Sequence, residues 1–175
     1  MTLANKITIL RIIFIPIYII ALLGNQHFLA LGLFTASMLT DFLDGFVARI
    51  RKQKTPLGTL LDPFADKFLL ISSFITLTYL QKIPIWATIV VFSKDLIIVL
   101  GWVVVYILTN RKTITPRWSG KIATFLQMMV IFVSLLGLGQ KVVNLSLYLM
   151  ILFTVISGID YIIVGNRNLN QLEVH

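Results

Sequence analysis

Cysteine is absent from this chain of 175 residues, and its only two histidines are His27 and His175. Without cysteine, the protein has no disulfide framework, no thiol nucleophile and no zinc–thiolate centre. With only two histidines, a catalytic triad that uses histidine is also improbable on composition. The chemistry of the protein must therefore depend on other side chains.

Charged residues are also scarce. They make up 13% of the chain, whereas soluble domains carry about 25%. Hydrophobic residues account for 58%. This composition excludes a soluble globular enzyme, a disordered chain and a nucleic-acid-binding module, although the formal net charge is +8. It indicates an integral membrane protein, whose partners are membrane lipids and not nucleic acid.

Apolar stretches of about 20 residues, the length needed to cross a bilayer, recur between polar turns and helix breakers. Pro56, Pro84 and Pro116 separate some of them, and Gly137 with Gly139 separates the last two. The predicted spans cover about residues 6–24, 28–49, 58–80, 84–109, 118–138 and 143–164. We expect an all-α integral membrane fold of six transmembrane helices in one bundle, a single domain over residues 1–175.

Lysine and arginine are unevenly distributed among the connecting segments. If the N-terminus is inside, that side holds the basic segments after the second and fourth spans, and the other side holds only Lys82 and Lys141. Because cytoplasmic loops carry the excess of Lys and Arg, we expect both termini to be cytoplasmic. This orientation suits a prokaryotic plasma membrane.

Six of the seven acidic residues lie inside predicted spans: Asp41, Asp44, Asp62, Asp66, Asp95 and Asp160. A carboxylate inside a bilayer is costly unless it faces a cavity, a cation or a partner. So many carboxylates in a chain so poor in charge predict a polar chamber within the bundle. For Asp160, near the end of the sixth span, we expect a structural role as the hydrogen-bond partner of a cationic or hydroxyl group.

Four of these aspartates form two pairs on neighbouring spans. Asp41 and Asp44 are three residues apart, and Asp62 and Asp66 are four apart, so each pair shares one helix face. Antiparallel helices joined by a short basic loop would bring the pairs together at the cytoplasmic side. Four carboxylates this close cannot all stay ionised without cations, and Mg²⁺ or Mn²⁺ is the natural match. Such ions beside Arg49 indicate phosphate or diphosphate chemistry.

Intramembrane carboxylates also mark ion pathways, so a small ion transporter or channel is the alternative from another class. An ion pathway should distribute polar groups across the bilayer, whereas the four paired aspartates cluster towards one face. The outer half of the predicted bundle has almost no charge. This asymmetry favours a reaction chamber that faces the cytoplasm.

Residues 41–66 read DFLDGFVARIRKQKTPLGTLLDPFAD. They match D-x2-D-G-x2-A-R-x8-G-x3-D-x3-D at every fixed position, and this pattern resembles the signature of the CDP-alcohol phosphotransferase family. Two further segments resemble the bacterial phosphatidylglycerophosphate synthase branch of that family. One is N-x-x-T-x-x-R, formed by Asn5, Thr8 and Arg11, and the other is G-K-x-x-T-x-x-Q at residues 120–127.

The resemblance implies a CDP-diacylglycerol-dependent phosphatidyltransferase that is a homodimer and uses two divalent cations. The metal ligands would be Asp41, Asp44, Asp62 and Asp66. The CDP site would be lined by Gly45, Ala48, Arg49 and Gly58. Asp66 would also be the general base, since a hydroxyl that attacks phosphorus must lose its proton and a carboxylate can accept it.

Two acceptors suit this branch. Glycerol 3-phosphate, the leading one, would give phosphatidylglycerophosphate, and phosphatidylglycerol would give cardiolipin. A phosphomonoester needs convergent cationic donors, for which the candidates are Lys94, Arg117 and Lys121. Ser93-Lys94-Asp95 departs from the Arg-Glu typical of phosphatidylglycerophosphate synthases and looks closer to eukaryotic-type cardiolipin synthases. In a purely structural interpretation, Lys94 and Asp95 neutralise charge within the bundle.

Overall fold

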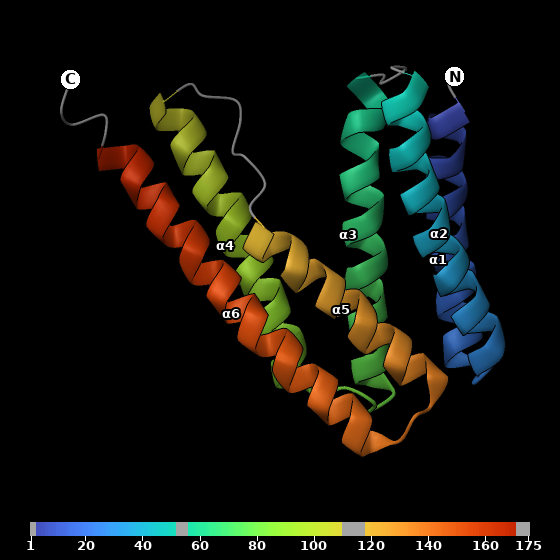
Figure 1. Ribbon diagram of the computed structural model, residues 1–175. Coiled ribbons are helices and arrows are strands. Elements are labelled where there is room, and N and C mark those ends of the chain that lie inside the picture. Colours follow the sequence, from blue (N-terminus) through green and yellow to red (C-terminus); the bar gives the residue numbers. More distant parts are fainter. Residues whose placement is uncertain (1–2, 52–55, 110–117, 171–175) are drawn as a thin grey trace. The chain divides into compact units, whose positions relative to one another are not determined.

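The computed structural model of the chain describes residues 3–51, 56–109 and 118–170 (Figure 1). Side chains are described for these residues except 3–9, 41–51, 56–63, 102, 104–109 and 165–170. The described residues form six helices: α1 (Leu3–Leu23), α2 (His27–Arg51), α3 (Pro56–Tyr79), α4 (Ile85–Thr109), α5 (Trp118–Leu136) and α6 (Gln140–Asn170).

The six helices coincide with the six predicted spans, which confirms the all-helical prediction. The largest difference is α6, which has 31 residues and extends beyond the predicted stretch at both ends. Its start is fixed by a compact turn in which Gly137 and Gly139 adopt φ angles of +69° and +83°. Glycine enters this left-handed region without a steric penalty, so the connection from α5 needs only three residues.

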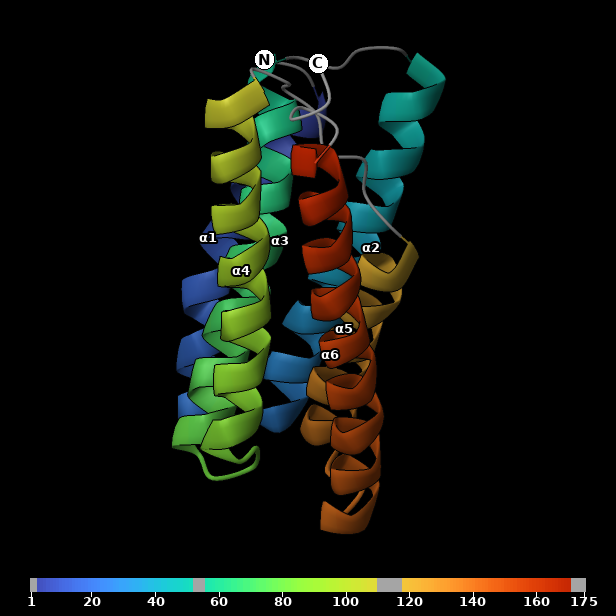
Figure 2. The same cartoon turned by 90° about the vertical axis from the view of Figure 1, so that its left-hand side faces the viewer.

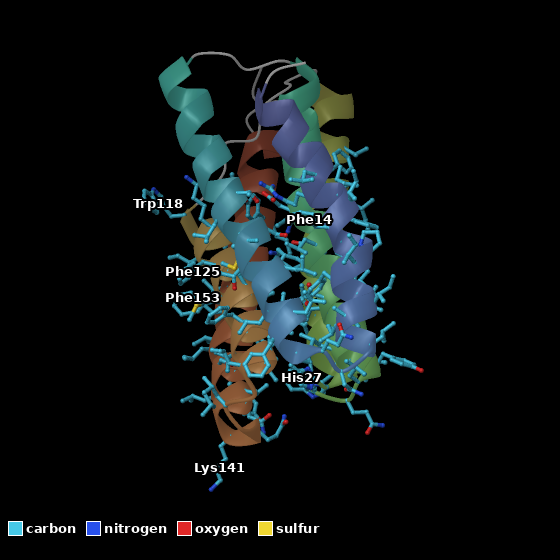
Figure 3. All side chains as sticks on the ribbon, turned by 90° about the vertical axis from the view of Figure 1, so that its right-hand side faces the viewer. Phe14, His27, Trp118, Phe125, Lys141 and Phe153 are labelled. Atoms are coloured by element: carbon cyan, nitrogen blue, oxygen red, sulfur yellow. The ribbon has the colours of Figure 1, made fainter. Side chains whose placement is uncertain are left out.

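Two of the described helical segments are long and apolar enough to cross a membrane, Trp118–Leu136 and Gln140–Val164. Shorter apolar stretches occupy Leu10–Leu23 and His27–Thr40. Many large apolar side chains are exposed, and Trp118 and Phe125 of α5 project away from the ribbon (Figure 3). Apolar surface of this extent is expected where helices face lipid. These features are those of a membrane protein.

The chain divides into two compact units. The first comprises residues 1–83 and 131–138, and the second comprises residues 84–130 and 139–175. In the first unit, α1 packs against both α2 and α3. In the second unit, α4 packs against α6, and the two helices lie side by side in both ribbon views (Figure 2).

A single stripe of α1 forms the centre of the first unit. Arg11, Ile15, Tyr18 and Leu22 recur at intervals of four and three residues, which is the period of one helix face, and all four are at most 2% exposed. Tyr18 contacts Phe34 of α2 at a ring-centroid distance of 6.0 Å. The stripe is apolar or aromatic along most of its length and ends in one buried cation.

One polar contact joins two turns at one end of the first unit. The Lys82 ammonium, just after α3, lies 3.4 Å from both ring nitrogens of His27, the first residue of α2. Burial lowers the pKa of Lys82 below its usual value. The contact places the start of α2 beside the end of α3, as expected for antiparallel neighbours.

The turn before α6 provides a test of this backbone geometry. We expect Gly139→Ala to lower the free energy of unfolding by about 1 kcal/mol, because a Cβ disfavours positive φ. Gly32→Ala is the matched control: Gly32 lies inside α2, and neither glycine has an atom within 4 Å of the position a Cβ would take. The control should leave stability unchanged or raise it through helix propensity. Equal effects in detergent denaturation experiments would contradict the assigned turn.

Candidate active site

The antiparallel course of α2 and α3 brings the two aspartate pairs towards one end of the first unit. Because His27 at the start of α2 touches Lys82 just after α3, the end of α2 and the start of α3 lie at the opposite end. The last part of α2 contains Asp41 and Asp44, and the first part of α3 contains Asp62 and Asp66. The backbone therefore places both pairs towards the same end, as the sequence predicts.

Buried residues of α2 precede the first pair. Phe34 is fully buried against Tyr18 of α1, and Ser37, one turn later, is 2% exposed. Asp41 and Asp44 follow later in α2, and their side chains lie outside the described ones.

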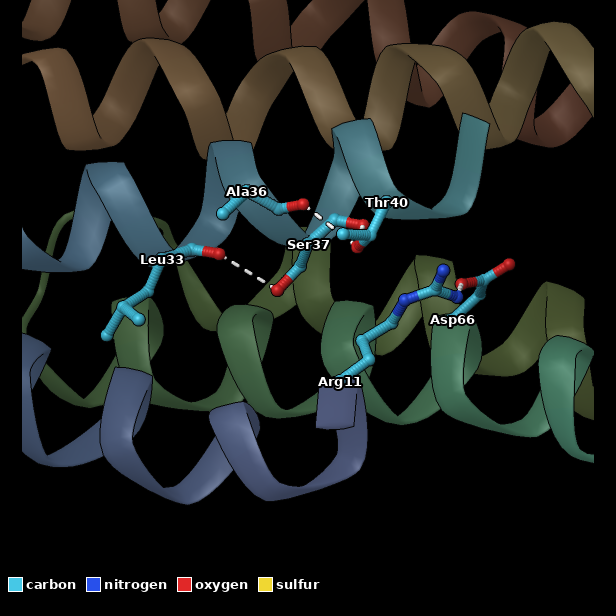
Figure 4. Close-up of polar contacts among 6 residues, drawn as sticks. All are labelled: Arg11, Leu33, Ala36, Ser37, Thr40 and Asp66. Carbon is cyan, nitrogen blue, oxygen red and sulfur yellow. Dashed lines mark hydrogen bonds and ion pairs between the residues drawn. The ribbon is translucent and has the colours of Figure 1, made fainter. Parts of the chain in front are cut away.

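The second pair is related to α1 by a direct contact. Nη1 of Arg11 donates a hydrogen bond to Oδ1 of Asp66 at 2.5 Å, forming an ion pair between α1 and α3 (Figure 4). The Arg11 side chain is 1% exposed and that of Asp66 is 27% exposed. A buried guanidinium is costly unless a carboxylate compensates its charge, so each group stabilises the position of the other.

Arg11 contacts a predicted site residue, and the sequence analysis assigned it no role in the site. The sequence offered two signals: a cation at the polar end of a buried stripe, and the N-x-x-T-x-x-R pattern in which Arg11 is the last fixed residue. Neither signal indicates which residue pairs with Arg11, because Asp66 lies 55 residues away in the chain. The pairing follows from the packing of α1 against α3.

Most of the other predicted site residues lie outside the described side chains. This applies to Asp41, Asp44, Gly45, Ala48, Arg49, Gly58 and Asp62, whose helices are described, and to Arg117. Among the described side chains, no group of three or more acidic or histidine residues could hold a metal ion. The four aspartates in their predicted pairs are oxygen donors of the type that Mg²⁺ and Mn²⁺ prefer, and Asp66 retains an exposed fraction.

The second unit contains the two predicted acceptor residues whose side chains are described. Lys94 Nζ lies 2.9 Å from Asp95 Oδ1, with the side chains 5% and 18% exposed. This ion pair agrees with the structural interpretation of the two residues. Lys121 Nζ lies 5.3 Å from the centroid of the Trp118 ring, a distance suited to a cation–π interaction.

Asp160 has the hydroxyl partner expected from the sequence. Oγ of Ser119, in the first turn of α5, donates a hydrogen bond of 2.7 Å to Oδ2 of Asp160 on α6. The contact ties α5 to α6 within the second unit. This hydrogen bond is of the structural kind that the sequence predicts for Asp160.

A family model described as CDP-alcohol phosphatidyltransferase matches residues 1–157. The match covers most of the chain, and the chain therefore belongs to this family of enzymes. It includes α1 to α5 and more than half of α6, and so it spans both compact units.

Relatives support the same assignment. A protein of Mycobacterium tuberculosis named "Probable phosphatidylglycerophosphate synthase" is 33% identical over 181 residues, covering 98% of this chain and 85% of that protein. A Bacillus subtilis protein named "CDP-diacylglycerol--glycerol-3-phosphate 3-phosphatidyltransferase" is 32% identical over 180 residues, covering 91% and 92%. A rat "Cardiolipin synthase (CMP-forming)" is 37% identical over 121 residues, covering 69% of this chain and 39% of that protein.

The ion pair between α1 and α3 can be tested by a double-mutant cycle. We expect Arg11→Met and Asp66→Asn each to lower the free energy of unfolding by about 2 kcal/mol or more, because each leaves a charge without its partner. The double variant should be less unstable than the sum, giving a coupling energy of about 1–3 kcal/mol. Strict additivity of the two effects would contradict the pair.

Proposed function

We propose that the protein transfers a phosphatidyl group from CDP-diacylglycerol to glycerol 3-phosphate, forming phosphatidylglycerophosphate and CMP. The observation that carries this proposal is the alignment over almost the whole chain with proteins named for this transfer. The match at every fixed position of the 41–66 pattern supports it further. An enzyme of this kind belongs to phospholipid biosynthesis. Family membership also favours an enzyme over a transporter.

Phosphatidylglycerol is the second candidate acceptor, and its use would make the protein a cardiolipin synthase. A specific observation favours it: Ser93-Lys94-Asp95 differs from the Arg-Glu expected of the first activity, and Lys94 is paired with Asp95. A lysine also cannot form the bidentate fork that arginine makes with phosphate. The similarity to a cardiolipin synthase covers a smaller part of that protein, which ranks this acceptor second.

The proposed reaction is an attack by an acceptor hydroxyl on the phosphorus that carries diacylglycerol. A new P–O bond forms, the P–O bond to the CMP phosphate breaks, and CMP leaves with the bonding electron pair. We assign Asp66 as the base that takes the hydroxyl proton. Arg11 holds this carboxylate in place through Oδ1 and so acts as a positioning residue.

Two divalent cations complete the proposed site. The four motif aspartates would hold them, and the cations would neutralise the diphosphate and stabilise the departing CMP. Gly45, Ala48, Arg49 and Gly58 would line the CDP site, where glycines allow close approach of a ligand. For the acceptor we retain Lys94, Arg117 and Lys121, with Lys121 favoured because it lies in the G-K-x-x-T-x-x-Q segment.

We further propose that all six helices cross a prokaryotic plasma membrane as one domain. The positions of lysine and arginine favour both termini and the polar chamber on the cytoplasmic side. A homodimer is the assembly that the family resemblance implies. The bacterial origin of the two long alignments supports the assignment of the membrane.

Release of CMP by the purified protein tests this function. With CDP-diacylglycerol and Mg²⁺ or Mn²⁺, we expect turnover with glycerol 3-phosphate and none after removal of the metal by a chelator. Phosphatidylglycerol, inositol phosphate and serine are offered separately. Turnover with phosphatidylglycerol alone would assign the cardiolipin reaction. A folded, metal-loaded sample that released no CMP with any acceptor would overturn the enzyme proposal.

The assigned base is tested with a pair of carboxylate variants. Asp66→Asn should reduce turnover by at least a hundredfold, since removing a general base costs about 10²–10⁴ in rate. Asp160→Asn is the control: its amide oxygen can still accept the hydrogen bond from Ser119, so activity should stay within about threefold. Thermal unfolding of both variants separates loss of chemistry from loss of fold. A folded Asp66→Asn variant with substantial turnover would refute this role.

A further inference from the structure

The second unit buries three polar side chains whose hydrogen-bonding atoms are unsatisfied. Gln127 of α5 and Thr154 and Ser157 of α6 are each 0% exposed. Both amide atoms of Gln127 and both hydroxyl oxygens are buried and have no hydrogen-bond partner among the described residues. The buried hydroxyls of Ser73 and Thr76 in the first unit donate to backbone carbonyls of α3, whereas Oη of Tyr18 and Nε of Arg11 are also unsatisfied.

The packing of α5 against α6 brings these residues to one level. The helices are antiparallel, and a Cβ at Gly120 would lie 3.0 Å from Oη of Tyr161. Gln127 follows Gly120 by seven residues and Thr154 precedes Tyr161 by seven, so both lie nearly two full turns from this contact, in the same direction along the two helices. Ser157 lies one turn from Thr154.

An ion pair lies beside Ser157. Cγ of Lys94 lies 3.7 Å from the position of a Cβ at Gly158, next to Ser157, and the Lys94 ammonium is paired with Asp95. The remaining groups are an amide and two hydroxyls, which both donate and accept hydrogen bonds. Such groups suit a neutral guest with the same dual capacity. A phosphate dianion accepts hydrogen bonds and would satisfy only the donors.

We propose that Gln127, Thr154 and Ser157 form a binding site for an uncharged, hydroxyl-bearing guest. The physical reason is the cost of leaving an amide and two hydroxyls buried without partners, which native proteins avoid. The hydroxyl comes from resident water or from the glycerol moiety of the acceptor. The second source rests on the proposed function, whereas the site itself does not.

Apolar replacements of similar size test the site. Gln127→Met and Thr154→Val remove the hydrogen-bonding atoms and keep the volume. If a guest is bound, each variant loses the bonds to that guest, and we expect Tm to fall by about 2–4 °C. If no guest is bound, removal of an unsatisfied polar group stabilises the fold, and Tm should rise or stay unchanged.

Thr124→Val is the matched control on α5. Thr124 lies one turn before Gln127, and its hydroxyl already donates a 3.0 Å hydrogen bond to the Gly120 carbonyl. Any drop in Tm caused only by the loss of a helical hydroxyl appears in this variant too. If a guest is bound, the fall in Tm caused by Gln127→Met and by Thr154→Val must be larger than the fall caused by Thr124→Val.

Kinetics then distinguish the two sources of the hydroxyl. A KM for glycerol 3-phosphate or phosphatidylglycerol raised at least fivefold in Gln127→Met, with KM for CDP-diacylglycerol unchanged, assigns the guest to the acceptor. A lowered Tm with unchanged KM values assigns it to resident water. Unchanged or raised Tm together with unchanged KM overturns the proposal. Repeating the Tm comparison with and without added glycerol 3-phosphate or phosphatidylglycerol tests both sources even if the wild-type protein shows no turnover, because a bound acceptor stabilises the fold only when it is present. Failure of the proposed function is therefore distinguishable.

Discussion

Compensation of charge inside an apolar helical assembly is the constraint on which this structure depends. The clearest case is Arg11, which lies at the end of a buried stripe of α1 and meets Asp66 across the interface with α3. Lipid cannot solvate either group, so the two helices must keep the register that joins them. The same contact places a carboxylate of the family signature at a fixed position beside α1.

Charged side chains of the second unit are compensated by different contacts. Lys94 and Asp95 are adjacent in α4 and pair with each other, and Asp160 of α6 accepts a hydrogen bond from Ser119 of α5. The hydrogen bond between α5 and α6 fixes the register of these two helices at the start of α5. The close approach of Gly120 to Tyr161 supports the same register.

The sequence predicted the six helices well because proline, glycine and polar turns interrupt apolar runs of nearly uniform length. The longer extent of α6 was missed, since an apolar pattern marks the membrane-crossing part of a helix and not its full length. The aspartate pairs were recognised from spacing. The partner of Arg11 was not, because a contact across 55 residues depends on how helices pack. The sequence showed Gln127 only as a fixed position of the G-K-x-x-T-x-x-Q segment, because its complete burial depends on how the helices pack.

The length of α6 has a consequence for how the protein sits in a bilayer. At 1.5 Å per residue, its 31 residues extend about 46 Å, whereas the hydrocarbon core is about 30 Å thick. The apolar part, Gln140–Val164, has 25 residues and extends about 37 Å, a mismatch that a membrane-crossing helix relieves by tilting. The segment after Val164 is polar and includes Arg167. In a helix that crosses a bilayer, a polar continuation of this kind belongs in the headgroup layer, where an arginine can meet anionic lipid phosphates.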